Sequence, residues 1–400
     1  MANPLDDIFD SFDKNKIFND KTVLQSRYKP EEILYRDEQI KQVASILAPV
    51  LRGERPSNLF LYGKTGTGKT LSIQFVKDEL LKRFKKDSPF SLRIEYLNCK
   101  LKKISDTEYR ILAELIKKLG GEVSQTGLPT QAVYSKFVEL IDSKKQMVIL
   151  ILDEIDQTTK KISDDFLYNL TRLNSELSKS QLSIIGISND LTFLDEIDSR
   201  VRSSLSEEEV VFHPYNALQL QKILKERALV SFHEGVLDSG VIEKCSAYAA
   251  REHGDARRAL DLLRIAGELA ERDGSGKILI KHLDEANNKL ERDKILDVIN
   301  SEPKQHHFVL YSIISLYEER GKDPFFTGDV YNLYQTLCQK NKLDILTQRR
   351  VSDIVQEFDM LGIININVVS KGRGGRMREI KLAISKDIIG KAKELIENSI

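Results

Sequence analysis

A glycine-rich loop between an apolar run and a helical pattern constrains this chain more than any other feature. The apolar run 58–62 precedes Gly-Lys-Thr-Gly-Thr-Gly-Lys-Thr at 63–70, and a helical pattern starts at Leu71. The glycines allow successive backbone N–H groups to turn toward one anion, because no Cβ stands in the way. The N-terminus of the following helix adds partial positive charge. Strand, loop and helix in this order predict a phosphate-binding loop of a nucleotide site.

The loop also supplies the expected ligands of the nucleotide. We expect Lys69 to reach the β- and γ-phosphates and the Thr70 hydroxyl to take one position on Mg²⁺. The residues expected to bind the nucleotide here are Gly63, Lys64, Thr65, Gly66, Thr67, Gly68, Lys69, Thr70 and Leu71.

A second motif lies at the end of a continuous apolar run. The run 147–152 predicts a strand buried on both faces of a parallel sheet, and Asp153 and Glu154 follow it directly. We expect Asp153 to share the metal with Thr70, and Glu154 to polarise a water for attack on the γ-phosphate. A protein that only binds a nucleotide needs the first carboxylate but not the second. The pair therefore favours Mg²⁺-dependent hydrolysis.

Composition limits the class of protein and its compartment. A chain of 400 residues is longer than one ordinary domain, and its formal net charge is +0, so any nucleic-acid surface has to be local. The three cysteines at 99, 245 and 338 are far apart, which favours a reducing cytoplasm and no zinc site. There is no run of eighteen apolar residues and the N-terminus is acidic, so we expect neither a membrane span nor a signal peptide.

The order of apolar patterns predicts three domains. Strand-like runs alternate with helical patterns up to Pro214, which indicates a parallel sheet with helices on both faces in a domain spanning 1–214. Helical periodicity then continues alone, which predicts a helical domain at 215–300. The strand-like runs lie at 59–62, 92–97, 148–152, 182–187 and 210–212, and the helical patterns at 216–232, 239–252, 255–272 and 280–300.

The last domain, 301–400, has the pattern of a winged helix. Helices are expected near 306–320, 328–341 and 347–361, followed by two short strands at 363–369 and 377–383. In the third helix Val351, Ile354, Val355 and Phe358 share one apolar face, and Thr347 lies where an N-cap belongs.

The polar side of this domain predicts contact with DNA. The third helix leaves polar and basic residues toward solvent, and the hairpin tip combines arginines with glycines that permit close approach to a backbone. A winged helix that binds protein instead remains the alternative. The residues expected to contact DNA are Thr347, Gln348, Arg349, Arg350, Ser352, Lys371, Arg373, Gly374 and Arg376, and Gln356 also faces solvent.

Further short motifs support a resemblance that runs essentially end to end. They are Tyr28-Lys-Pro-Glu-Glu-Ile-Leu-Tyr-Arg36, Ser188-Asn189, Asp198-Ser-Arg-Val-Arg-Ser-Ser-Leu205, His213-Pro-Tyr215 and Gly254-Asp-Ala-Arg257-Arg-Ala-Leu. With these motifs the chain resembles the archaeal replication-initiator proteins related to the origin recognition complex and its helicase-loading cousin. These are AAA+ ATPases with a helical lid and a C-terminal winged helix.

The resemblance assigns a role to each motif. It implies that the segment 28–36 packs over the adenine, and that Asn189 is the first sensor residue and Arg257 the second sensor, on the lid. It implies that Tyr215 and Arg227 close on the nucleotide from the hinge and the first lid helix. Arg200 and Arg202 resemble arginine fingers that act on a neighbouring protomer, and the choice between them stays open.

The crossover at about 101–140 is longer than a simple connection. It occupies the place of the family's initiator-specific insertion, which touches DNA in relatives. By resemblance, the residues expected near DNA in its loop are Ser124, Gln125, Thr126, Leu128, Pro129 and Thr130.

The resemblance implies a cytoplasmic, nucleoid-associated replication initiator that binds double-stranded origin DNA. ATP, ADP and Mg²⁺ are the expected cofactors, with slow hydrolysis as a switch. The expected partners are a replicative helicase of the minichromosome maintenance type and a second initiator paralogue, and no membrane. Two alternatives remain: a clamp-loader or motor ATPase that acts on proteins, and a winged-helix signalling ATPase that regulates transcription.

Overall fold

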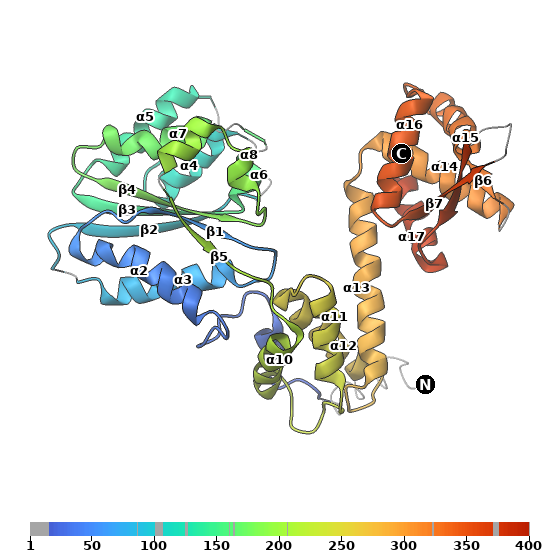
Figure 1. Cartoon of the computed structure of the whole chain (residues 1–400), viewed down its shortest axis with the longest axis horizontal. Helices are drawn as coiled ribbons and strands as arrows, with labels where there is room; N and C mark the ends of the chain where they lie inside the picture. The colour runs from blue at the N-terminus through green and yellow to red at the C-terminus, as the bar shows by residue number, and fades with distance from the viewer. Residues whose placement is uncertain are drawn as a thin grey trace, which may run out of the picture. The chain divides into compact units, whose positions relative to one another are not determined.

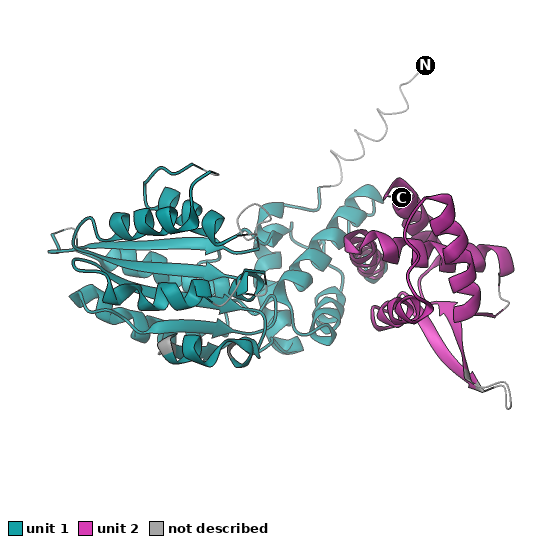
Figure 2. Ribbon diagram, turned by 90° about the horizontal axis from the view of Figure 1, so that it is seen from above, with its two compact units in different colours: residues 1–283 teal, residues 284–400 magenta. Residues whose placement is uncertain are grey.

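The computed structural model describes residues 16–85, 87–100, 107–124, 127–159, 161–162, 165–205, 207–321, 324–370 and 376–399. They form two compact units, residues 1–283 and 284–400 (Figure 2). No helix within these ranges combines the length and apolar character that crossing a lipid bilayer requires.

The first unit is built on a parallel sheet, as predicted. Its strands lie in the order β2-β3-β4-β1-β5, so the strand that leads into the phosphate loop lies between β4 and the edge strand β5. The strands are β1 (Asn58–Tyr62), β2 (Ser91–Asn98), β3 (Gln146–Asp153), β4 (Gln181–Ser188) and β5 (Glu207–Val211).

The edge strand begins earlier than its apolar run suggested. The prediction at 210–212 missed the acidic start of β5, because β5 pairs only with β1 and leaves Glu208 and Glu209 exposed to water. An edge strand that exposes charged residues to water does not show an apolar pattern along its whole length.

Helices cover both faces of the sheet (Figure 1). One face carries α2 (Asp37–Leu47) and α3 (Lys69–Arg83). The other carries α4 (Glu108–Lys118), α5 (Thr130–Ile141) and α7 (Asp165–Arg172). The shorter helices α6 (Ile155–Thr159), α8 (Phe193–Glu196) and α9 (Ser199–Leu205) complete this domain.

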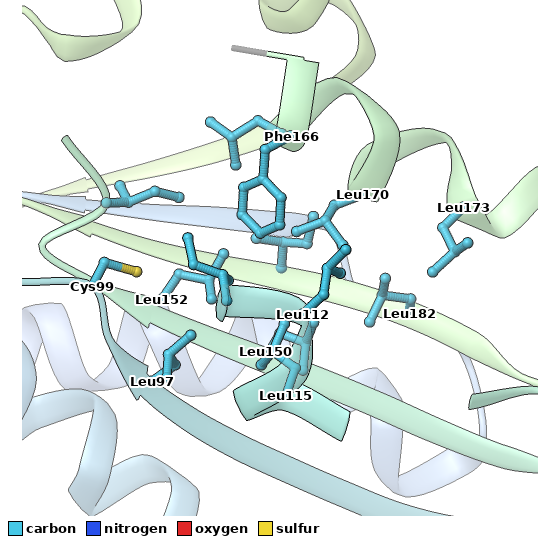
Figure 3. Packing of buried hydrophobic residues seen from close by; sticks show 14 of the residues in the cluster. Leu97, Cys99, Leu112, Leu115, Leu150, Leu152, Phe166, Leu170, Leu173 and Leu182 are labelled. Carbon is cyan, nitrogen blue, oxygen red and sulfur yellow. The ribbon is translucent and has the colours of Figure 1, made fainter. Parts of the chain in front are cut away.

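The central strand β3 explains why both faces are apolar. Val148, Leu150 and Leu152 point into the core under α4 and α7, and Ile149 and Ile151 point into the core on the opposite face. This follows from the two-residue period of a strand. Figure 3 shows leucines of β3, α4 and α7 interdigitating in the first of these cores.

A helical lid follows β5. It contains α10 (Ala217–Ser231), α11 (Val241–Arg251) and α12 (Ala256–Arg272), close to the predicted helices. The chain before α2 packs on this lid: Val23 and Leu24 of the 3₁₀ helix η1 (Lys21–Leu24) are buried, and Phe18 pairs with Phe232. The 3₁₀ turns η2 (Ala48–Arg52) and η3 (Leu173–Ser175) complete the elements of the sheet domain.

The second unit confirms the predicted winged helix. Its elements are α14 (Lys304–Arg320), β6 (Phe325–Phe326), α15 (Thr327–Lys340), α16 (Gln348–Met360), β7 (Ile364–Ser370), β8 (Arg376–Leu382) and α17 (Lys386–Ser399). The sequence missed β6, because two residues are too few to show a strand period; the sheet order is β6-β8-β7. The helix α13 (Ile280–Ser301) spans the boundary between the two units.

The core of the second unit holds the predicted apolar face of α16. Val351, Ile354, Val355 and Phe358 are all fully buried in it. The opposite side of α16 is therefore left to solvent.

Candidate functional site

A cavity of about 910 Å³ lies in the first unit between the phosphate loop, the segment 23–34 and the lid. It brings together most of the residues predicted to bind or process a nucleotide, from six separate stretches of the sequence. The predicted residues that line it are Thr65, Gly66, Thr67, Gly68, Lys69, Thr70, Leu71, Asp153, Glu154, Asn189, Tyr215, Arg227 and Arg257.

Lys69 is held at the floor of the phosphate loop. Its Nζ donates to the carbonyl oxygens of Gly63 and Lys64 at 2.6 and 2.9 Å. It also donates to Asn189 Oδ1 at 2.9 Å. Gly63 and Lys64 do not line the cavity themselves, so in this structure their carbonyls place the lysine. Burial lowers the pKa of Lys69 to about 8, because the charged form loses its hydration.

Two glycines of the loop lie where a side chain would be crowded. Gly66 has a φ of 71°, and a Cβ there would lie 1.7 Å from Asp255 Oδ1 of the lid. Gly68 has a φ of 91°, and a Cβ there would lie 3.0 Å from the Tyr215 hydroxyl. Both positions favour glycine by backbone conformation and by space.

Thr70 and Asp153 meet as the sequence predicted. Thr70 Oγ1 donates to Asp153 Oδ2 at 2.8 Å, so the two oxygens lie together at the end of β3. Mg²⁺ is typically held by one or two carboxylates, with waters and substrate phosphates filling the remaining positions. Thr70 and Asp153 fit such a site, and no cluster of three or more His, Cys, Asp or Glu side chains that suits a metal occurs in the described ranges.

Tyr96 is a residue of this site that the sequence analysis missed. Its hydroxyl donates to the same oxygen, Asp153 Oδ2, at 2.7 Å. Burial, and then the Asp153 carboxylate, raise the pKa of Tyr96 well above its usual value, so the hydroxyl stays a neutral donor. The contact depends on the pairing of β2 with β3, which brings the ends of these strands together. No pattern of residues in the sequence predicted this pairing.

Glu154 occupies a strained backbone position beside Asp153. Its φ of 57° is unusual for a residue other than glycine, and such conformations persist where the surrounding structure fixes them. Its side chain is 18% exposed, and Lys100 Nζ lies 3.6 Å from Glu154 Oε2. The carboxylate thus reaches the cavity with one exposed lysine as its partner.

The far end of the cavity is suited to a nucleotide base. Tyr28, Pro30, Ile33, Ile223 and Val230 supply aromatic and apolar surface there. The Arg227 guanidinium lies 4.6 Å from the centre of the Tyr28 ring. A planar base fits a wall of this composition, because it stacks on aromatic and guanidinium planes.

The lid contributes the remaining predicted residues. Asp255 caps α12 by accepting from the backbone N–H of Arg257 at 2.8 Å, which places Arg257 in the first turn of that helix and on the cavity wall. The Arg257 charge also contributes to the lowered pKa of Lys69, as expected of two cations that share one site.

The two candidate arginine fingers do not line this cavity. Arg200 forms a forked ion pair with Asp198 at 2.9 and 3.1 Å, and Arg202 pairs with Asp195 at 2.9 Å. Both side chains are substantially exposed, 78% and 49%. Each is bound to an aspartate of its own chain.

The winged helix presents part of the predicted DNA surface. Thr347 caps α16 by accepting from the Arg350 backbone N–H, as predicted, and Gln348, Arg349 and Arg350 are exposed. Arg378, which the sequence analysis did not select, donates to the Ser352 hydroxyl at 2.9 Å and so ties β8 to α16. Lys371, Arg373 and Gly374 lie outside the described residues, and Arg376 is described as the first residue of β8 only through its backbone.

The insertion contributes a short exposed turn before α5. Leu128 is 45% exposed, Pro129 is the N-cap of α5 and Thr130 begins it. The Ser124 carbonyl accepts from the Tyr109 hydroxyl at 2.7 Å, which anchors the loop to α4. The predicted residues Gln125 and Thr126 fall outside the described part of the chain.

The chain matches three family models in the order of its domains. Residues 52–192 match an AAA domain, residues 221–288 the Cdc6 AAA+ ATPase-type lid domain, and residues 297–392 the Cdc6 C-terminal winged-helix domain. The parallel sheet is therefore that of an AAA domain, and the helical lid and the winged helix are those of the Cdc6 type.

Curated relatives are similar over nearly the whole chain. The ORC1-type DNA replication protein of Thermococcus onnurineus is 53% identical over 388 residues, covering 96% of this chain and 92% of the relative. The ORC1-type DNA replication protein 1 of Methanosarcina mazei is 49% identical over 386 residues, covering 96% and 92%.

Solved structures agree. The ORC1 protein of Aeropyrum pernix, described in complex with DNA, is 40% identical with a TM-score of 0.81, and the match covers 96% of this chain and 99% of that one. Cdc6p of Pyrobaculum aerophilum shares the fold at 18% identity and a TM-score of 0.60, over 96% and 98% of the two chains. The relatives are this similar over nearly the whole chain, and the phosphate loop, lid and winged helix are all present. The chain therefore belongs to the family of ORC1-type DNA replication proteins.

Proposed function

We propose that this protein is a nucleotide-switched replication initiator that binds double-stranded origin DNA and helps to recruit or load the replicative helicase. The observation that carries this proposal is the combination, in one chain, of a cavity lined by the phosphate loop and a winged helix whose α16 exposes Arg349 and Arg350 in its first turn. The first supplies a switch, and the second supplies a DNA surface.

The cavity fits ATP or ADP with Mg²⁺. Backbone N–H groups of the phosphate loop and Lys69 would hold the phosphates, and Tyr28 and Arg227 would hold the base. Thr70 and Asp153 would hold the metal. Bound Mg²⁺-ATP would supply the terminal phosphoryl group and a cation that neutralises its charge.

Hydrolysis depends on groups of this chain around that terminal phosphate. Glu154 would orient a water and accept its proton, and Asn189 would hold the water or the phosphate by its amide. Arg257 would contact the same phosphate from the lid, so the lid angle would differ between the ATP and ADP states. Lys69 would exchange its carbonyl partners for phosphate oxygens on binding.

Two features support slow turnover by a single protomer. Lys100 lies 3.6 Å from Glu154 and competes with water for this carboxylate. Arg200 and Arg202 pair with aspartates of their own chain and do not line its cavity, so a finger formed by either would have to act on a second protomer. Arginine fingers are typically worth about 10³–10⁵ in rate.

The DNA surface is proposed to have two parts. The winged helix would use Thr347, Gln348, Arg349, Arg350 and Ser352 on α16, with the hairpin tip. The insertion would use Ser124, Gln125, Thr126, Leu128, Pro129 and Thr130. The ORC1 protein of Aeropyrum pernix, described in complex with DNA, supports DNA binding by this chain. The helicase partner of the minichromosome maintenance type, a second initiator paralogue and a cytoplasmic, nucleoid-associated location are proposed from the family.

The test is footprinting on chromosomal fragments of the host, with and without ATP, at two salt concentrations. Discrete footprints near replication start sites that change with ATP would support the initiator. Lys69→Ala should remove the ATP effect while leaving salt-sensitive DNA contact. Uniform binding without footprints would contradict the proposal and favour a loader or motor that contacts DNA without sequence preference.

A further inference from the structure

Arg36 is a buried cation that forms no ion pair with any carboxylate in the described part of the chain. It is 4% exposed, precedes α2 and is the last residue of the motif 28–36 that was expected to cover the base. A charge buried in this way normally has a carboxylate partner or a ligand. Burial lowers the pKa of Arg36, which is the expected effect of lost hydration.

The guanidinium instead spans the phosphate loop and the hinge of the lid. Nε donates to the Thr67 carbonyl at 2.7 Å, and one terminal nitrogen donates to the His213 carbonyl at 2.6 Å. The other terminal nitrogen donates to the Tyr35 carbonyl at 3.1 Å. The centre of the guanidinium lies 3.9 Å from the centre of the Tyr215 ring, as in a stacked cation–π pair.

The bond to Thr67 has a consequence for the anion site. The C=O and N–H of a trans peptide unit point in opposite directions. Because Arg36 holds the Thr67 carbonyl on its own side, the N–H of Gly68 is directed away from Arg36. Thr67 and Gly68 both line the cavity, so a bound phosphate would contact the peptide unit between them.

The hinge side of Arg36 leads directly to the lid. The Tyr215 backbone N–H donates to the Gly254 carbonyl at 3.3 Å, and a Cβ at Gly254 would lie 2.2 Å from the Tyr215 carbonyl oxygen. Gly254 precedes Asp255, the N-cap of the helix that carries Arg257. The N–H of Ala256 in turn donates to the Gly66 carbonyl at 3.3 Å. Contacts therefore run from the phosphate loop through Arg36 and Tyr215 to the lid and return to the loop.

We propose that Arg36 is a positioning residue that orients the Thr67–Gly68 peptide for phosphate binding and links it to the lid turn that carries Arg257. The inference rests on the proposed nucleotide binding and adds the part of the chain that joins loop and lid. A guanidinium suits this role, because it is planar and can donate to carbonyls on two segments while it stacks on a ring.

The test compares Arg36→Met and Arg36→Lys with the natural protein. Methionine fills much of the volume of the arginine side chain but has no hydrogen-bond donors. Lysine keeps the charge but cannot donate to two carbonyls while it stacks on the Tyr215 ring. Arg52→Met is the matched control, because the Arg52 side chain is 73% exposed and pairs only with nearby Glu54 among the described residues. We would measure ADP affinity by calorimetry, and hydrogen exchange at residues 254–258 with and without ADP.

We expect ADP to slow exchange at 254–258 in the natural protein and in Arg52→Met. In both Arg36 variants this protection should be lost, and ADP should bind about tenfold more weakly, which is within the usual range of coupling between two sites. Full protection and unchanged affinity in Arg36→Lys would overturn the inference, since charge alone would then suffice. Protection retained in Arg36→Met would overturn it as well.

The outcomes separate this inference from the proposed function. If the natural protein binds no ADP, the proposed function fails, whatever the variants do. If it binds ADP and the Arg36 variants behave as the natural protein does, the inference alone fails. Should Arg36→Met not fold, Tyr215→Leu removes the stack from the other side; normal lid protection in that variant would contradict the inference, and lost protection would support it.

Discussion

Asp255 of the lid occupies the space that a side chain at Gly66 of the phosphate loop would need. A Cβ on Gly66 would lie only 1.7 Å from Asp255 Oδ1, although Gly66 falls in the AAA domain match and Asp255 in the lid match. Asp255 also accepts from the N–H groups of Arg257 and Arg258. The residue that caps the lid helix therefore also packs against the loop, and this close contact requires that Gly66 has no side chain.

Gly66→Ala should separate the lid from the loop. The added methyl displaces Asp255, and the φ of 71° at Gly66 adds backbone strain, so we expect stability to fall by about 1–3 kcal/mol and ADP affinity to fall too. Gly235→Ala is the control, because Gly235 has a φ of 77° and no atom within 4 Å of the added Cβ. Thermal unfolding and calorimetry would check both, and equal losses in the two variants would show that strain alone is responsible.

Glu154→Gln should separate binding from hydrolysis. The amide keeps the size of the side chain but accepts no proton from water, so we expect normal ATP affinity and turnover lower by about 10²–10⁴-fold. Lys69→Ala should instead abolish nucleotide binding, because it removes the charge at the loop. Single-turnover assays and binding titrations would distinguish them; normal turnover in Glu154→Gln would remove Glu154 from the catalytic assignment.

Tyr96→Phe should weaken the metal site without disturbing binding of the nucleotide base. The hydroxyl donates to Asp153 Oδ2 at 2.7 Å, and loss of a partner of a metal ligand typically costs about 10–100-fold in metal affinity. We expect the Mg²⁺ concentration needed for tight ATP binding to rise about tenfold, while metal-free ADP binding stays unchanged. Tyr109→Phe, which loses a hydroxyl bond in the insertion, is the control. An unchanged Mg²⁺ requirement in Tyr96→Phe would contradict the role of Tyr96.

Nucleotide binding in the presence of a metal chelator should take up protons. The pKa of Lys69 is lowered to about 8 in the free protein, and phosphate oxygens beside it would raise this pKa on binding. Lys69 is thus charged below this pH and loses charge above it, so affinity should fall as pH rises past about 8, to about tenfold weaker at pH 9 than at pH 7. Calorimetry in two buffers of different ionisation enthalpy would detect uptake near pH 8. Proton release, or none, would contradict it.

Arg373→Ala should weaken binding to all duplex DNA alike. If its side chain contacts a phosphate, removing it should reduce the slope of log affinity against log salt concentration by about one. Arg320→Ala is the control in the same unit, since Arg320 pairs with Asp329 on the neighbouring helix α15. Titrations at several salt concentrations would show the slope; an unchanged slope for Arg373→Ala would place the hairpin tip off the DNA.

The sequence by itself determined the elements whose pattern is local. The apolar run before the loop, the acidic pair after β3 and the apolar face of α16 each predicted an element that the structure contains, because the period of the side chains and the glycine positions express it directly. Resemblance then placed Asn189, Tyr215, Arg227 and Arg257 around one nucleotide, and all four line the cavity.

Tertiary structure alone decided the residues that act across strands and domains. Tyr96 reaches Asp153 only because β2 pairs with β3, and Arg36 reaches the phosphate loop and the hinge only because the chain before α2 passes between them. The edge position of β5 and the two-residue strand β6 likewise depend on what packs beside them. A linear pattern records which side chains are apolar at a given period, whereas a contact between distant segments depends on strand order and domain docking, which no local pattern carries.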